Sequence, residues 1–156
     1  MQSEQPNTVS PPTKTMKVEL NRVDDAFHFE ATGVSDVPVH IDGAVDIGGH
    51  NAGARPMEML LMGLAGCSAI DVILILKKQR QVIEDFRITV EGQRPADATP
   101  APFHTIHLHY ILKGNLDEDK ARRAIDLSMD KYCSATAQLR PTASITYSLT
   151  IEKPEA

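Results

Sequence analysis

Residues 57–78 have the sequence MEMLLMGLAGCSAIDVILILKK, and this stretch decides the fold. It is apolar at nearly every position, so a helix formed here has no polar face and must be buried on all sides. The glycine-rich segment 43–56, GAVDIGGHNAGARP, leads into it and ends in Pro56, a residue that the first turn of a helix accepts. The pattern predicts a central core helix from Met57 to about Lys78.

The same stretch is long enough to suggest a membrane span, because about 20 apolar residues cross a bilayer. Glu58 and Asp71 interrupt it, and no second apolar stretch of this length follows. We therefore expect a soluble protein without a membrane partner.

Strand patterns lie on both sides of this helix. Three short β-type segments precede it, two longer ones follow as a hairpin, and one ends the chain. Between the hairpin and the last strand, Asn115 and Glu118 have capping-box spacing at the start of a second helix. Ser134 is placed to cap a third, short helix that Pro141 ends. The order βββ-α-ββ-αα-β predicts an α+β fold. The predicted strands are 17–23, 26–33, 37–41, 86–94, 103–114 and 143–151, and the second helix is 117–132.

Length and composition point to one cytoplasmic domain. A chain of 156 residues fits a single core. The polar, proline-rich residues 1–16 lack the apolar core of a signal peptide and are predicted to be a disordered tail before a domain at 17–156. Two cysteines are too few for a secreted disulfide scaffold. A net charge of −5, the absence of tryptophan and scattered basic residues argue against nucleic acid as a partner.

Cys67 and Cys133 are the residues best suited to chemistry. Cys67 lies within the helix among small neighbours that leave room for a substrate, but buried cysteines are also common as inert core residues. It is three turns from the start of its helix, so a cation brought by the fold would have to activate it. Cys133 lies just before the amides of the next helix, where a thiolate is better stabilised. No CxxC motif links the two, so spacing alone leaves both interpretations open.

Asp71 follows Cys67 by one helical turn, on the same face. A carboxylate beside a thiol raises the thiol pKa. The simpler interpretation is that Asp71 binds backbone amides of the glycine-rich loop, or a cation across an interface, because buried charges are usually paired.

Histidines raise the question of a metal. His107 and His109 share one face of a predicted strand near His104, and His50 lies in the glycine-rich loop. The opposite strand face is apolar, so these histidines are better explained as its polar side. No HExxH or CxxC spacing is present, and we expect neither a metal nor a cofactor.

Two stretches together resemble the OsmC/Ohr family, and especially its YhfA-like branch. They are Arg55–Val72, RPMEMLLMGLAGCSAIDV, and Leu127–Ser134, LSMDKYCS. The resemblance extends over about Lys17–Ile151. It implies an intertwined homodimer with the cysteine helices packed at its centre and two sites at the subunit interface.

The resemblance also implies a chemistry, that of the peroxidase members of the family. In them the first cysteine attacks an organic hydroperoxide and becomes a sulfenic acid, and the second resolves it as a disulfide that a dithiol reductant reopens. On the matching positions, Cys67 is the peroxidatic thiol and Cys133 the resolving one. The expected role is peroxiredoxin-like defence against oxidative stress.

One family feature is absent from this sequence. Peroxidase members carry a glutamate directly after the proline that opens the helix, and it holds an arginine against the thiolate; here that position is Met57. Glu58 comes one residue later, about 100° around the helix. Arg22 is the nearest counterpart of the arginine. The alternative is therefore a dimeric binding or redox-sensing protein whose apolar pocket at the subunit interface is lined by Met57, Met59 and Met62 and holds a small hydrophobic ligand.

Overall fold

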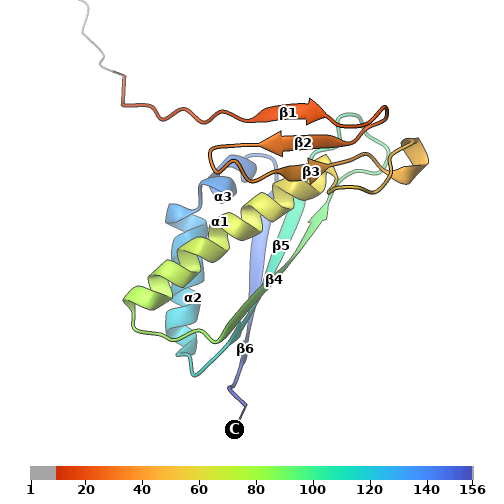
Figure 1. The fold of residues 1–156 in the computed structure, drawn as a ribbon. Coiled ribbons are helices and arrows are strands. Elements are labelled where there is room, and N and C mark those ends of the chain that lie inside the picture. Colours follow the sequence, from red (N-terminus) through yellow and green to blue (C-terminus); the bar gives the residue numbers. More distant parts are fainter. Residues whose placement is uncertain (1–9, 156) are drawn as a thin grey trace, which may run out of the picture. The chain divides into compact units, whose positions relative to one another are not determined.

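The structure is a computed structural model and describes residues 10–155. It divides into two compact units, one up to Pro56 and one from Met57 onward. The element order confirms the predicted βββ-α-ββ-αα-β arrangement (Figure 1). In chain order the elements are β1 Glu19–Arg22, β2 Phe29–Thr32, β3 Val39–Ile41, the 3-10 turn η1 Val45–Ile47, α1 Pro56–Lys78, β4 Asp85–Gln93, β5 Thr105–Lys113, α2 Glu118–Leu127, the π-turn η2 Ser128–Tyr132, α3 Ser134–Leu139 and β6 Ser144–Glu152.

The first unit is an antiparallel meander, β1-β2-β3, followed by the glycine-rich loop. Asp42 organises this loop, because its buried carboxylate accepts hydrogen bonds from the amides of Gly43 at 2.7 Å, His50 at 2.9 Å and Ala52 at 3.0 Å. The Ala52 amide, helped by the other two, holds the pKa of Asp42 below its ordinary value of 3.8, although burial acts in the opposite direction. A single carboxylate thus fixes the path of the loop.

The second unit packs helices on one side of a three-stranded sheet. β4 pairs antiparallel with β5, which confirms the predicted hairpin, and β5 pairs parallel with β6. α1 and α2 cover the face of β5 that carries Ile106, Leu108, Tyr110 and Leu112 (Figure 1). The buried residues of α1 are spaced four apart, so they form one stripe along the helix. These residues are Leu64, Ser68, Val72 and Leu76.

Residues 10–155 leave one side of α1 exposed, so the expected burial of this helix on all sides stays a prediction that depends on a partner. Met62 is 53% exposed and Ile70 is 62% exposed. The sheet and α2 reach only one side of the helix, so the rest of its apolar surface needs cover from elsewhere. By length and a hydropathy of 2.3, α1 could also cross a membrane, but core helices of soluble proteins meet the same criterion.

Both predicted helix caps are displaced by one or two residues. The cap of α2 is Asp117, whose side chain accepts a hydrogen bond from the Lys120 amide at 3.0 Å, and not Asn115. Asp117 stands directly before the first helical residue, where a side-chain oxygen reaches the third amide, whereas Asn115 comes too early. The cap of α3 is Cys133, and Ser134 is the first residue of the helix.

Asp42→Asn should lower the melting temperature by several degrees at pH 7, because an amide group replaces one of the two oxygens that accept the three loop amides. The folded-state pKa of Asp42 is depressed, so its contribution is present above 3.8 and is lost as the pH falls through the folded pKa. Circular dichroism melts should therefore show a gap between wild type and variant that shrinks below pH 3.8. Asp46→Asn, at an exposed position in the same loop, is the control and should melt like wild type. An equal gap at pH 7 and pH 3 would contradict this role.

Candidate functional site

Three side chains of the second unit converge where α1 passes the start of α3. Cys67 and Asp71 are one turn apart on α1, and Cys133 follows the π-turn η2. The two sulfur atoms and a carboxylate oxygen of Asp71 all lie within 4.8 Å of one another. Both cysteines are free thiols, Cys67 partly buried and Cys133 buried. The structure thus brings together two residues that no local motif connects.

Cys133 has a defined electrostatic environment. Its amide donates to the Ser128 carbonyl oxygen at 2.7 Å, which closes the π-turn and takes the chain out of the helix. Its sulfur accepts a hydrogen bond from the Thr136 amide at 3.3 Å, as the cap of α3. Burial, helped by the neighbouring Cys67, raises the pKa of the Cys133 thiol above its ordinary value of 9.0, and the side chain and amide of Thr136 oppose this only in part. Cys133 is therefore a protonated thiol at neutral pH.

Asp71 ends a chain of buried hydroxyl groups. Ser128 Oγ donates to Asp71 Oδ2 at 3.1 Å, Ser68 Oγ lies 3.0 Å from Ser128 Oγ, and Tyr110 is hydrogen-bonded to Ser68. Ser68, Ser128 and Tyr110 are fully buried. Asp71 is thus hydrogen-bonded to Ser128, whereas the carboxylate that binds the loop amides is Asp42. A cation that reaches Asp71 across a subunit interface stays a prediction.

The direction of every bond in this chain follows from counting protons. The carboxylate accepts, so the one hydroxyl proton of Ser128 goes to Asp71. Ser128 must then accept from Ser68, and Ser68 from Tyr110. Burial raises the pKa of Tyr110 to about 12, so its hydroxyl keeps the proton that it donates. All of the hydrogen bonds run toward the carboxylate, and hydrogen bonds in such a chain polarise one another.

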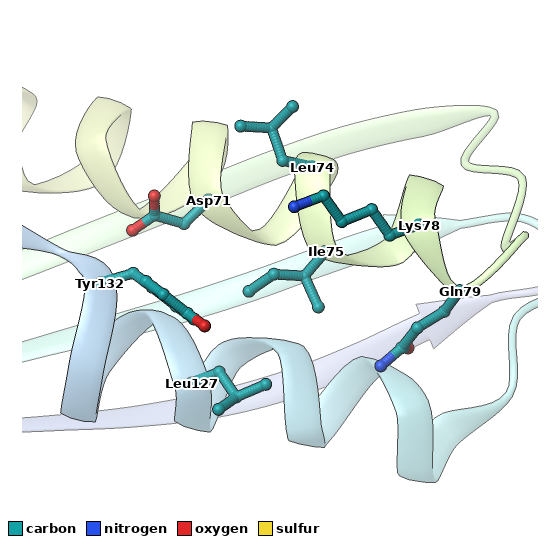
Figure 2. A pocket seen from close by; sticks show the side chains of 7 residues that line it. All are labelled: Asp71, Leu74, Ile75, Lys78, Gln79, Leu127 and Tyr132. Carbon is teal, nitrogen blue, oxygen red and sulfur yellow. The ribbon is translucent and has the colours of Figure 1, made fainter.

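A cavity of about 340 Å³ adjoins the site. Figure 2 shows Asp71 at one end of it, with Ile75 of α1 and Leu127 of α2 facing each other farther along. Tyr132, the neighbour of Cys133, also lines it. The remaining lining residues are Leu74, Lys78 and Gln79. The cavity is mainly apolar, with the carboxylate and one lysine as its charged groups, so it suits a small apolar molecule.

The methionines predicted to line an interface pocket lie on an earlier part of α1 than Asp71, and that pocket stays a prediction. Met57 packs against the core of the second unit, and Met62 lines a separate cavity of about 290 Å³ together with Glu58. Met59 lines neither of these cavities. The walls of the cavity beside Asp71 come from a later part of α1 than these methionines.

Arg22 belongs to the first unit, whereas both cysteines belong to the second. Its guanidinium donates to the carbonyl oxygen of Ala26 at 2.9 Å and to that of Asp25. These bonds hold it to the turn of its own hairpin. Its proximity to Cys67 stays a prediction.

The histidines serve as the polar side of the second sheet, as predicted. His107 bonds the hydroxyls of Thr146 and Ser148 on β6, and His109 bonds Ser148 and Thr150. His50 pairs with Asp24 at 3.0 Å. Within residues 10–155, the only group of three or more His, Cys, Asp or Glu side chains close enough to share a metal ion is Cys67, Asp71 and Cys133. Thiolate and carboxylate are donors that zinc accepts, but a disulfide between the cysteines would use the same sulfurs.

This fold and this thiol site define an OsmC-like protein. The family model described as OsmC-like protein matches residues 49–148, and the chain belongs to this family. It is similar to Protein YhfA of Escherichia coli K12, with 45% identity over 94 residues that cover 60% of this chain and 69% of YhfA.

Solved structures show the same fold. A hypothetical protein from Aquifex aeolicus aligns with a TM-score of 0.80 and 29% identity, covering 92% of this chain and all of that one. An organic hydroperoxide resistance protein OsmC from Legionella pneumophila aligns with a TM-score of 0.67 and 15% identity, over 90% of this chain and 99% of that one. Both alignments show that the fold of this chain is shared with these proteins.

Proposed function

We propose that this chain is a cytoplasmic, thiol-dependent reductase of organic hydroperoxides, with Cys67 as the peroxidatic and Cys133 as the resolving thiol. The observation that carries the proposal is the separation of at most 4.8 Å between the two sulfurs. A disulfide needs about 2 Å between sulfurs, and a small movement of η2 or a change of side-chain rotamer supplies the difference. The family's hydroperoxide-resistance members support the same function.

The reaction has two steps. The Cys67 thiolate attacks the terminal oxygen of the hydroperoxide, the O–O bond breaks, an alcohol leaves after taking up a proton, and Cys67 becomes a sulfenic acid. The Cys133 sulfur then attacks the Cys67 sulfur, the S–O bond breaks, and water leaves as the disulfide forms. The two thiols supply both electrons, so the reaction needs no cofactor. An external dithiol restores the thiols.

The apolar cavity beside Asp71 suits the organic part of the substrate. Ile75 and Leu127 give it apolar walls, and its end at Asp71 and Tyr132 is the end nearest the thiols. An apolar substrate bound there lies against Asp71, whose carboxylate is within 4.8 Å of the Cys67 sulfur.

An equimolar amount of cumene hydroperoxide should give an intrachain Cys67–Cys133 disulfide, because the sulfenic acid on Cys67 forms within reach of the second thiol. Peptide mass mapping under non-reducing conditions measures it. In Cys133→Ser the sulfenic acid should persist and be trapped by dimedone, and Cys67→Ser should not react. Wild type that keeps both thiols reduced in excess hydroperoxide would refute the proposal.

Thiols that stay reduced in excess hydroperoxide would favour a second candidate function, that of a non-catalytic binding or redox-sensing protein. The observation on its side is Met57, which stands where peroxidase members have glutamate and packs into the core. Under this interpretation the 340 Å³ cavity holds a small hydrophobic ligand, and Cys67 is a packing or sensing residue.

We also propose that the protein acts as a homodimer. Large apolar side chains of α1 are exposed along the helix, and a stripe of this kind is costly in water. The same apolar stripe on α1 of a second chain would cover it, as the family's intertwined assembly implies. The exposed residues are Leu60, Met62, Ile70, Ile73 and Leu74.

Sedimentation velocity at micromolar concentration should give the mass of two 17.1 kDa chains. Ile70→Glu, which adds a charge to the exposed side of α1, should shift the protein toward monomer because a charge without a partner is costly inside an apolar interface. Val82→Glu, at an exposed site after α1, is the control and should stay dimeric. A stable wild-type monomer would contradict the dimer.

A further inference from the structure

Asp71 is an unfavourable neighbour for a thiol that must react as its thiolate. Its carboxylate oxygen lies within 4.8 Å of the Cys67 sulfur, and a negative charge at this distance disfavours a second one on the thiol. Within residues 10–155, no lysine, arginine or histidine forms an ion pair with Asp71. The hydroxyl chain from Tyr110 instead holds the carboxylate beside the sulfurs. Asp71 therefore hinders the first step of the proposed reaction.

The second step, disulfide formation, needs a group that takes up one proton and releases another, and Asp71 is placed to do so. Cys133 is a buried thiol and must lose its proton as its sulfur attacks the sulfenic acid. The hydroxide that leaves Cys67 must gain a proton to depart as water. One group close to both sulfurs can do both. A carboxylate oxygen of Asp71 lies within 4.8 Å of each, and the movement that closes the disulfide must also bring this oxygen into hydrogen-bond range.

We propose that Asp71 is the proton shuttle of disulfide formation. It takes the proton from the Cys133 thiol while the S–S bond forms, and gives it to the hydroxide displaced from Cys67, which leaves as water. Asp71 ends the step ionised, as it began, and the two thiols carry the whole oxidation. The inference rests on the proposed peroxidase function and adds a catalytic residue to it.

Ser128 is the positioning residue for this carboxylate. It donates to Oδ2 of Asp71 at 3.1 Å, and its own oxygen accepts from Ser68, which fixes the position of the carboxylate. Ser128 also supplies the carbonyl that accepts from the Cys133 amide. A single residue thus sets both the carboxylate and the resolving cysteine.

Asp71→Asn separates the two steps because it should affect them in opposite directions. Sulfenic acid formation, followed by dimedone trapping in the Cys133→Ser background, should be as fast as with Asp71 or faster, since a negative charge near Cys67 is gone. Disulfide formation, followed by rapid quench and intact mass in the two-cysteine protein, should slow on the order of 100-fold, within the usual range for loss of a general base. All samples contain a chelator, so that no metal ion occupies the three donor atoms.

Two further variants test the assignment. Ser128→Ala keeps the Asp71 carboxylate but removes the hydrogen bond that positions it. This variant should slow only disulfide formation, by roughly ten-fold, which is less than the effect of losing the general base itself. Asp130→Asn removes an exposed carboxylate of η2 that is paired with Arg140, and should leave both steps at wild-type rates. Asp130 matches Asp71 in charge but is not part of the group formed by Cys67, Asp71 and Cys133.

The outcomes are distinct. Disulfide formation at the wild-type rate in Asp71→Asn would overturn the shuttle while leaving the peroxidase function intact. Equal slowing of both steps would also overturn it, because that is the effect of a merely structural residue. If wild type forms no sulfenic acid, the proposed function fails and the shuttle with it.

Discussion

The stripe of α1 that is buried against β5 is the constraint on which the site depends. Leu64, Ser68, Val72 and Leu76 follow one another at four-residue intervals, and their burial fixes the rotation of the helix about its axis. That rotation sets the positions of Cys67 and Asp71, which lie to one side of the stripe. It also brings Ser68, the one polar residue of the stripe, against Tyr110. A buried hydroxyl group without a hydrogen-bond partner would destabilise the fold. Ser68 has such partners because it belongs to the chain of hydrogen bonds that ends on Asp71.

The two cysteines are consequently unequal. Cys67 is partly exposed on a long helix, one turn before Asp71, which lines the 340 Å³ cavity. Cys133 is buried and protonated, and it lies between the π-turn η2 and the short helix α3. A peroxidatic thiol must meet an external molecule, whereas a resolving thiol needs only to reach the first sulfur. The partly exposed position of Cys67 suits the first requirement, and the buried position of Cys133, within 4.8 Å of the other sulfur, suits the second, as the proposed roles require.

Much of the fold could be predicted because its signals are local. The apolar run after Pro56, the strand alternation and the hairpin around residues 94–104 all appear in the structure as expected. The helix caps were missed by one or two residues because several polar side chains compete within each turn, and the sulfur of Cys133 caps α3 in place of a hydroxyl.

The site was only partly accessible to sequence reasoning. Cys67, Cys133 and Asp71 were identified, but Ser68, Ser128 and Tyr110 were not, since they come from three elements that only the tertiary fold brings together. The sequence feature that could have pointed to Ser68 is that it is the only polar residue among buried positions spaced four apart on α1. Asp42 was missed for a similar reason: its three amide partners lie up to ten residues away in an irregular loop.

The central claim, that Cys67 and Cys133 act as one redox pair, is tested most directly by stoichiometry. The reduced protein is titrated with sub-stoichiometric cumene hydroperoxide, and the remaining thiols are counted after unfolding. A working pair predicts that two thiols disappear for each hydroperoxide consumed and that both return with a dithiol reductant. Loss of one thiol for each hydroperoxide, or of none, would contradict the account.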